Sequence, residues 1–207
     1  MLKSFDGNSI ARFHDQVLHS PHRNRFADAA TDAWRWVEAN HRFNTLLWGE
    51  EDKARRTDVD AAEIAASKRL IDQYNQKRND AIEALDEAIL TELQHVTPDS
   101  DARLNSETAG AMIDRLSILA LKIFHMREQT ERTDASPEHI ETCRNKLERL
   151  QLQRQDLISC LDQLLREAEA GRAYFKVYRQ FKMYNDPTLN PYLYARRSSP
   201  QAGRMLS

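Results

Sequence analysis

The chain has 207 residues, of which 30% are charged, and contains only six prolines and five glycines. So few helix-breaking residues favour long helices and argue against a sheet-rich fold. The formal net charge of −2 provides no overall attraction to nucleic acid or to an anionic membrane, so we do not expect nucleic acid as a partner.

The cysteines and the first residues indicate the compartment. Cys143 and Cys160 are the only cysteines, and neither belongs to a CxxC or Cys/His motif, so we expect no zinc site and no disulfide framework. The opening MLKSFDGNSIARFHDQ lacks the apolar core of a signal peptide, and no run is long and apolar enough to span a bilayer. We therefore expect a cytoplasmic protein without a membrane span.

The first predicted helix covers residues 9–18, with apolar side chains on one side. His14, His19 and His22 lie in or beside the break that follows it. Their spacing fits no single helical face, and no carboxylate completes a ligand set. We therefore expect no metal and no other cofactor.

The second predicted helix, 25–55, has an inner line that begins apolar and becomes polar halfway along. The line comprises Phe26, Ala30, Ala33, Trp34, Val37, His41, Asn44, Trp48, Glu51 and Arg55, with Asp52 at its edge. Either the helix extends past the core into water, or its polar end faces a ligand cavity. Trp48 would be an unusual residue to leave in water.

The third predicted helix, 61–95, has Arg78 at the centre of its apolar face. A guanidinium removed from water without a partner is costly, so Arg78 should meet either an acid or an anionic ligand. Thr57 or Asp58 is the expected N-cap. The side chains expected to face solvent on the opposite side are Asp72, Asn79, Asp80 and Glu83.

The most hydrophobic stretch, AMIDRLSILALKIFHM at 111–126, predicts a central helix around which the others pack. Its polar residues gather on one side, but Ile118 and Leu121 lie among them. Such a mixed strip suits a half-buried polar network or the lining of a ligand cavity. The polar residues are Asp114, Arg115, Ser117, Lys122 and His125.

Two more helices are predicted towards the C-terminus. Helix 137–170 begins at the N-cap Ser136 and keeps a heptad seam that contains Arg154. Arg154 either fixes the helix register against an acid or joins Arg78 at a shared site. Residues 172–183 are predicted to form another helix, with Arg172, Lys176 and Arg179 in a basic stripe and Lys182 beside it. The stripe is either a solvated face or a contact with phosphate or an acidic partner.

These elements predict an all-α fold, an antiparallel bundle of about five to six helices, three of them long, around the central helix 111–126. Residues 1–194 are expected to form a single helical domain. Residues 195–207, ARRSSPQAGRMLS, have the composition of a flexible tail.

Four segments together resemble one bacterial protein family. They are NTLLWGEEDKAR, KRLIDQYNQKRNDAIEALD, DRLSILALKIFHM and FKMYNDPTLNPYLY, and they look like the family catalogued as domain of unknown function 4254. The resemblance implies a cytoplasmic bacterial helical protein, with relatives linked to cell-envelope polysaccharide metabolism. It carries over no catalytic residue.

Three functions compete on this evidence from the residues. The first is a polar cavity in the bundle for an anionic small molecule such as a nucleotide sugar or a phosphate. The second is a non-catalytic adaptor or scaffold that homodimerises through its long helices. The third is an all-α metal-dependent nucleotide pyrophosphohydrolase, for which Glu83-x-x-Asp86 offers one suitable spacing while Glu51 lacks an acid three residues later.

The catalytic residues remain unknown at this level, and whether the protein is an enzyme is left open. Candidate ligand-binding residues are those polar or aromatic side chains that interrupt apolar faces. They are His41, Asn44, Trp48, Glu51, Asp52, Arg55, Arg78, Asp114, Lys122 and His125.

Overall fold

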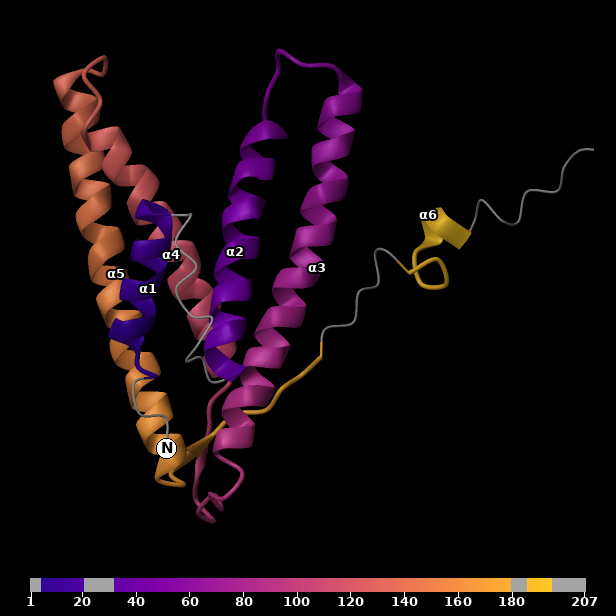
Figure 1. Ribbon diagram of the computed structural model, residues 1–207, viewed down its shortest axis with the longest axis vertical. Helices are drawn as coiled ribbons and strands as arrows, with labels where there is room; N and C mark the ends of the chain where they lie inside the picture. Colours follow the sequence, from indigo (N-terminus) through magenta and orange to yellow (C-terminus); the bar gives the residue numbers. More distant parts are fainter. Residues whose placement is uncertain (1–4, 21–31, 180–185, 195–207) are drawn as a thin grey trace, which may run out of the picture. The chain divides into compact units, whose positions relative to one another are not determined.

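The computed structural model describes residues 5–20, 32–179 and 186–194. The chain separates into two compact units, Met1–Val177 and Tyr178–Ser207. In the described part of the first unit the helices are α1 (Gly7–His19), α2 (Asp32–Lys53), α3 (Ala61–Glu92), α4 (Ala109–Thr130) and α5 (Pro137–Glu169) (Figure 1). The second unit contains the short helix α6 (Pro191–Tyr194). The expected all-α fold is confirmed.

The helices of the first unit pack mainly as two pairs, α2 with α3 and α4 with α5. Within each pair the helices run in opposite directions (Figure 1), which fits an antiparallel bundle. α4 contacts each of α1, α2, α3 and α5. Its fully buried side chains include Ile113, Leu116 and Ile123, so the most hydrophobic stretch of the sequence is the central helix, as predicted.

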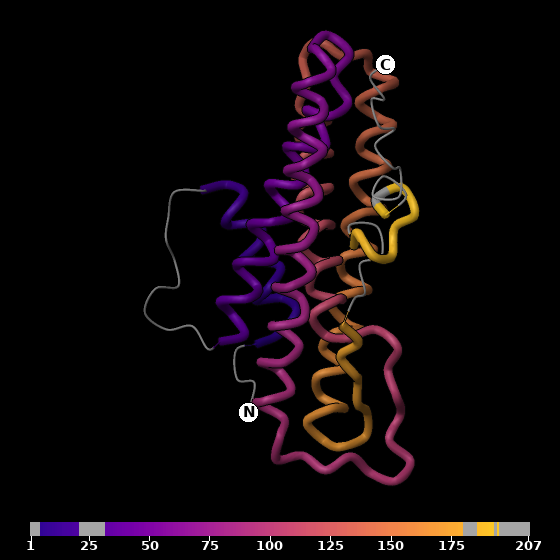
Figure 2. Tube along the Cα trace, turned by 90° about the vertical axis from the view of Figure 1, so that its right-hand side faces the viewer, coloured from indigo at the N-terminus to yellow at the C-terminus, as the bar shows by residue number. Residues whose placement is uncertain are grey.

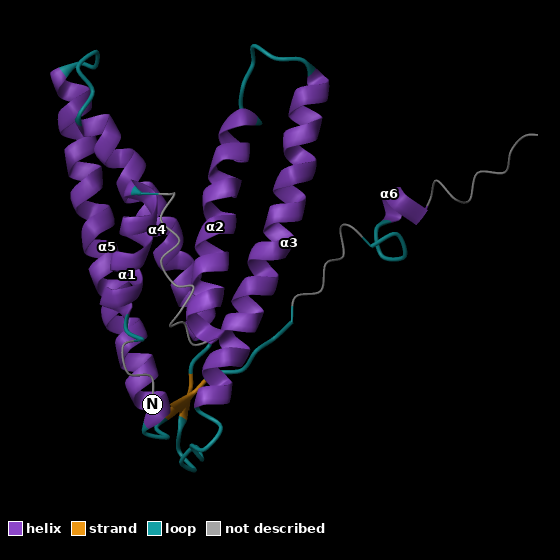
Figure 3. Ribbon diagram, in the orientation of Figure 1, coloured by secondary structure: helices purple, strands orange, loops and turns teal. Residues whose placement is uncertain are grey.

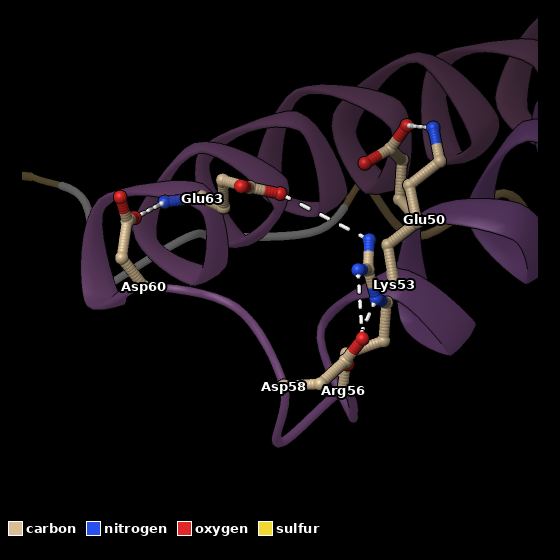
Figure 4. A network of polar contacts seen from close by, with 6 residues as sticks. All are labelled: Glu50, Lys53, Arg56, Asp58, Asp60 and Glu63. Atoms are coloured by element: carbon tan, nitrogen blue, oxygen red, sulfur yellow. Dashed lines mark hydrogen bonds and ion pairs between the residues drawn. The ribbon is translucent and has the colours of Figure 1, made fainter.

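The loop between α2 and α3 is held by local ion pairs and by a helix cap (Figure 4). Asp60, rather than Thr57 or Asp58, is the N-cap of α3, because its Oδ1 accepts the Glu63 N–H at 2.9 Å. Asp58 instead accepts two hydrogen bonds from the Arg56 guanidinium, at 3.1 and 3.2 Å. In this loop Asp58 therefore binds an arginine, and Asp60 caps the helix that follows.

The helix predicted for 172–183 is wrong over residues 172–179. Gly171, with φ of 75°, ends α5 in the left-handed region, and Ala173–Tyr174 then form strand β2, which pairs in parallel with β1, Arg103–Leu104 (Figure 3). Ala173 and Phe175 are both buried, a period of two that a helix cannot present to one side. Lys182 and the end of the predicted helix lie outside the described residues.

The pairing of β1 with β2 fastens the long connection between α3 and α4 to the end of α5. Figure 2 shows this connection curving round the end of the helices before α4 begins. Backbone hydrogen bonds of 2.9 Å join Asp99 N–H to the Gly171 oxygen and Arg103 N–H to the Arg172 oxygen. The carbonyl oxygens of Gly171 and Arg172 thus have hydrogen-bond partners although no further helical turn follows α5.

The solvent-facing assignment on α3 is wrong for Asn79, which is only 8% exposed. Asn79, Asp86 and Leu93 recur every seven residues and are all buried, so α3 buries a wider face than its apolar residues alone indicate. Glu83 is half-buried, whereas Asp72 and Asp80 are exposed as expected.

Several predictions concern residues outside the described part of the chain. These are the start of the second helix with Phe26 and Ala30, the histidine His22, and the tail 195–207. Among the described residues, no helix has the combination of length and apolar character that crossing a bilayer requires.

Candidate functional site

Two neighbouring cavities lie among the long helices of the first unit. The larger cavity, of about 670 Å³, is formed by α2, α4 and α5. Its lining residues are Trp48, Asp52, Lys122, His125, Met126, Gln129, Lys146, Arg149, Leu150 and Gln153. This volume is within the range of natural small-molecule sites, about 300 to 1,000 Å³.

The smaller cavity, of about 330 Å³, is formed by α2, α3 and α4. Its lining residues are Asn44, Leu47, Trp48, Glu51, Asp52, Arg55, Arg78, Ile118 and Leu121. Trp48 and Asp52 belong to both linings. The two cavities are therefore adjacent, and α2 provides the residues at their boundary.

An aromatic pair stands at this boundary. The rings of Trp48 on α2 and His125 on α4 stack with centroids 4.7 Å apart and an interplanar angle of 12°. The His125 Nδ1 lies 2.8 Å from Glu128 Oε2, one helical turn further along α4. Trp48 is thus half-buried by stacking, with part of its ring left to line both cavities.

The larger cavity has an excess of positive charge. Lys122 on α4 and Lys146 and Arg149 on α5 face Asp52, the one carboxylate of the lining. None of the three cations forms an ion pair with any described residue. All three side chains are exposed, as is Arg144 on the same stretch of α5, which does pair with Glu141. The cavity therefore gathers cations whose charge the described protein residues leave uncompensated.

Beneath the smaller cavity, Asp114 is the centre of a buried hydrogen-bond network. Its Oδ1 accepts hydrogen bonds of 2.8 Å from the side-chain amides of Asn40 and Asn44, and it lies 3.8 Å from Arg78 Nε. Arg78 and Asp114 therefore form an ion pair, but 3.8 Å is too long for a hydrogen bond. Arg78 therefore meets an acid, one of the two partners that its position in the sequence required.

The network continues from Asn44 into the interior. Asn44 Nδ2 donates to Ser117 Oγ at 3.0 Å, and Ser117 Oγ lies 2.8 Å from His41 Nδ1. Asn40, His41 and Ser117 are at most 1% exposed. His41 Nε2 has no hydrogen-bond partner among the described residues, but the bonded groups of these three residues position helices against each other and are too deeply buried to touch a ligand.

Two buried histidines end the network. The ring of His14 on α1 stacks on that of His41, with centroids 4.5 Å apart. Both nitrogens of the His14 ring are buried without a hydrogen-bond partner among the described residues. Burial lowers the pKa of His41 to about 4 and holds the pKa of His14 well below its usual range, with the nearby His41 and Arg154 acting in the same direction on His14. Both rings are therefore neutral near pH 7.

Arg154 pairs with an acid of α1 and not with the residues around Arg78. Its Nη1 donates to Asp15 Oδ1 on α1 at 2.7 Å. Arg78 pairs with Asp114, so the two arginines serve different contacts. This pairing fits the interpretation that Arg154 fixes helix register and contradicts a site shared with Arg78.

Asp86, the second acid of the Glu83-x-x-Asp86 pattern, has a structural role. Asp86 Oδ1 accepts the Gly110 N–H at 2.6 Å, at the start of α4, and a Cβ at Gly110 would come within 2.8 Å of that oxygen. Burial raises the pKa of Asp86 to about 6, although hydrogen bonds from Thr108 and Gly110 oppose the rise. Among the described residues, no group of three or more His, Cys, Asp or Glu is arranged to hold a metal ion.

The structure brings the sequence candidates to one region of the bundle. The cavity-lining candidates are Asn44, Trp48, Glu51, Asp52, Arg55, Arg78, Lys122 and His125, while His41 and Asp114 belong to the network below. Sequence reasoning missed Asn40 and His14. It also missed Lys146, Arg149 and Gln153 of α5, whose spacing of three and four residues is the only signal and is shared by any solvated helix face.

Comparison with known proteins identifies a family but no characterised relative. Residues 34–177, more than half of the chain, match the family model described as "Protein of unknown function (DUF4254)". No curated protein and no solved structure matches the chain. The matched range contains every residue that lines the two cavities.

Proposed function

This chain belongs to the DUF4254 family, and we propose that its larger cavity binds a small molecule that carries phosphate, as a nucleotide or a nucleotide sugar does. The observation that supports this most strongly is the set of Lys122, Lys146 and Arg149 around one cavity, none of them paired with a described acid. The three side chains are exposed, so water and salt screen much of the repulsion among them, and a phosphate bound between them gains charge-assisted hydrogen bonds.

The remaining lining suits such a ligand. Trp48 offers an aromatic face on which a base or the CH face of a sugar ring can stack. Met126 and Leu150 add apolar area, and pockets of natural ligands combine mostly apolar walls with a few convergent polar groups. Asp52 and His125 provide groups able to exchange a proton with a bound ligand, so the cavity has parts for chemistry as well as for binding.

The proposal also concerns the metabolism in which the protein acts. The resemblance to the family implies a bacterial cytoplasmic protein linked to cell-envelope polysaccharide metabolism. Nucleotide sugars and sugar phosphates are the phosphate-bearing precursors that such chemistry uses, so they are the first ligands to test.

The test is a thermal shift experiment with inorganic pyrophosphate, nucleoside diphosphates, nucleotide sugars and sugar phosphates. A ligand that binds only the native state raises the melting temperature. At a ligand concentration 100 times Kd it adds about 2.7 kcal/mol to the free energy of unfolding. We expect at least one of these ligands to raise the melting temperature of the wild-type chain. The double variant Lys146→Gln/Arg149→Gln should lose most of that shift, because it removes two of the three cations.

The matched control is Lys68→Gln/Arg69→Gln, which removes the same two charges from an exposed part of α3 outside both cavities. This control should keep the wild-type response. If the panel produces no shift, or if both double variants lose it equally, the proposed cavity function is wrong. An absent response would favour a non-catalytic adaptor.

A further inference from the structure

The two cavities differ in charge although they share Trp48 and Asp52. The larger one opposes three cations with the single carboxylate of Asp52. In the smaller one, two arginines face two carboxylates, those of Glu51 and Asp52. Phosphate is therefore favoured in the larger cavity, while the smaller cavity offers no net attraction to an anion.

The groups that line the smaller cavity suit an uncharged ligand with many hydroxyls. Glu51, in the last turn of α2, pairs at 3.2 Å with Arg55, which lies just beyond the end of the helix. Arg78 is held 3.8 Å from Asp114. The Asp52 carboxylate has no partner among the described residues, so it is available to accept hydrogen bonds. Hydroxyl groups can donate to carboxylates and accept from guanidinium groups in the same small space.

The apolar part of the same lining is also suitable. Ile118 and Leu121 of α4 and the ring of Trp48 line the smaller cavity. A sugar ring has both faces of this kind, hydroxyls around its edge and CH groups on its flat side, and aromatic rings recognise the latter through apolar contact. A second phosphate in this cavity would instead approach two carboxylates.

We propose, as an extension that rests on the function proposed above, that the ligand is a sugar joined to phosphate. The phosphate lies in the larger cavity against Lys122, Lys146 and Arg149. The sugar ring lies in the smaller cavity, where its hydroxyls donate to Asp52 and its flat side contacts Trp48. Asp52 thus acts as a specificity residue, because it favours a sugar and disfavours additional negative charge at the boundary.

The experiment is isothermal titration calorimetry with a ladder of three probes, namely inorganic pyrophosphate, uridine diphosphate and uridine diphosphate glucose. Each step adds one part of the ligand to the diphosphate and also removes one of its ionisable oxygens, so a gain in affinity at the glucose step is obtained against a loss of negative charge. We expect the glucose step to tighten binding at least about tenfold, which corresponds to about 1.4 kcal/mol.

The variant Asp52→Asn should change two quantities in opposite directions: the affinity for pyrophosphate and the gain in affinity from glucose. It should tighten pyrophosphate binding, since a negative charge beside the phosphates is removed. It should also reduce the gain from glucose, since a neutral amide oxygen is a weaker acceptor than a carboxylate. Asp72→Asn, an exposed change on α3, is the matched control and should leave the whole ladder unchanged.

The outcomes separate this inference from the proposal beneath it. If pyrophosphate and uridine diphosphate bind but glucose adds nothing, the sugar subsite is wrong and the phosphate cavity stands. The same conclusion follows if Asp52→Asn shifts all three probes in the same direction by the same factor. If none of the three probes binds, the phosphate cavity itself is wrong.

Discussion

The buried polar network and the cavity lining use the same types of residue on α2 and α4, but they differ in burial: the network side chains are buried against one another, whereas the lining side chains Asp52 and Lys122 are exposed and form no ion pair with a described residue. On α2, Asn40 and Asn44 are buried and bonded to Asp114, whereas Asp52, two turns further along, is exposed and has no partner among the described residues. α4 changes in the same way, from the buried Asp114 and Ser117 of the network to the exposed Lys122 of the lining, which forms no ion pair with a described residue.

Polar side chains on apolar helix faces therefore serve two purposes in this protein: some position helices, and others line a cavity. A polar side chain on an apolar face is costly unless it has a partner, so the sequence pattern alone marks both groups. Where the protein provides the partner, the group positions helices. Where it provides none and a cavity is present, a ligand is the partner that we propose.

The comparison is tested most strongly by making the same substitution in both regions. Asp114→Ala should lower the free energy of unfolding by about 3 to 5 kcal/mol, because the Arg78 guanidinium and the amides of Asn40 and Asn44 lose their common acceptor. Asp52→Ala should change it by no more than about 0.5 kcal/mol. Chemical denaturation followed by circular dichroism measures both. Equal losses in the two variants would remove the distinction between network and lining.

A second test uses pH, which acts on the network through its histidines. The native state holds His41 neutral with a pKa of about 4, while the unfolded chain takes up a proton near pH 6.5. The stability that is present above pH 6.5 is therefore lost as the pH falls towards 4, by about 3 kcal/mol from His41 alone. His14 acts in the same direction, and Asp86, with its pKa raised to about 6, offsets part of the loss between pH 6 and 4.

The variant His41→Gln isolates this effect, because an amide does not titrate in that range. The stability gap between the wild type and the variant should narrow by about 3 kcal/mol between pH 7 and pH 4. Denaturant titrations at several pH values measure the gap. Parallel stability curves for the two proteins would show that His41 is not held neutral by burial.

The fold was predictable because periodicity and caps are local signals. The hydrophobic run of α4 and the Ser136-Pro137 start of α5 lie where the sequence places them. The strand β2 was not predictable, since Ala173 and Tyr174 extend along β1, a partner about seventy residues away, and no local propensity reports such a pairing. The same applies to Asn79, whose burial depends on how wide a face α3 presents.

The candidate site was predictable on α2, α3 and α4, where polar residues interrupt apolar faces. It was not predictable on α5, because Lys146 and Arg149 belong to a stripe that would look the same in solvent. His14 was recognisable only as one of three neighbouring histidines, and its contact with His41 joins helices that are separated by residues outside the described chain. Partners of this kind are set by packing, which the sequence pattern alone does not contain.

The most direct test of a ligand at the boundary of the cavities is the indole N–H signal of Trp48 in a two-dimensional nitrogen–proton NMR spectrum. The chain has three tryptophans, so three indole signals are expected, and Trp48→Phe identifies the one that belongs to Trp48. Trp34 and Trp36 pack against the core instead. On titration with uridine diphosphate glucose, we expect the Trp48 signal to move in a saturable way while the other two stay in place. A Trp48 signal that does not move, or three signals that move together, would contradict the proposed site.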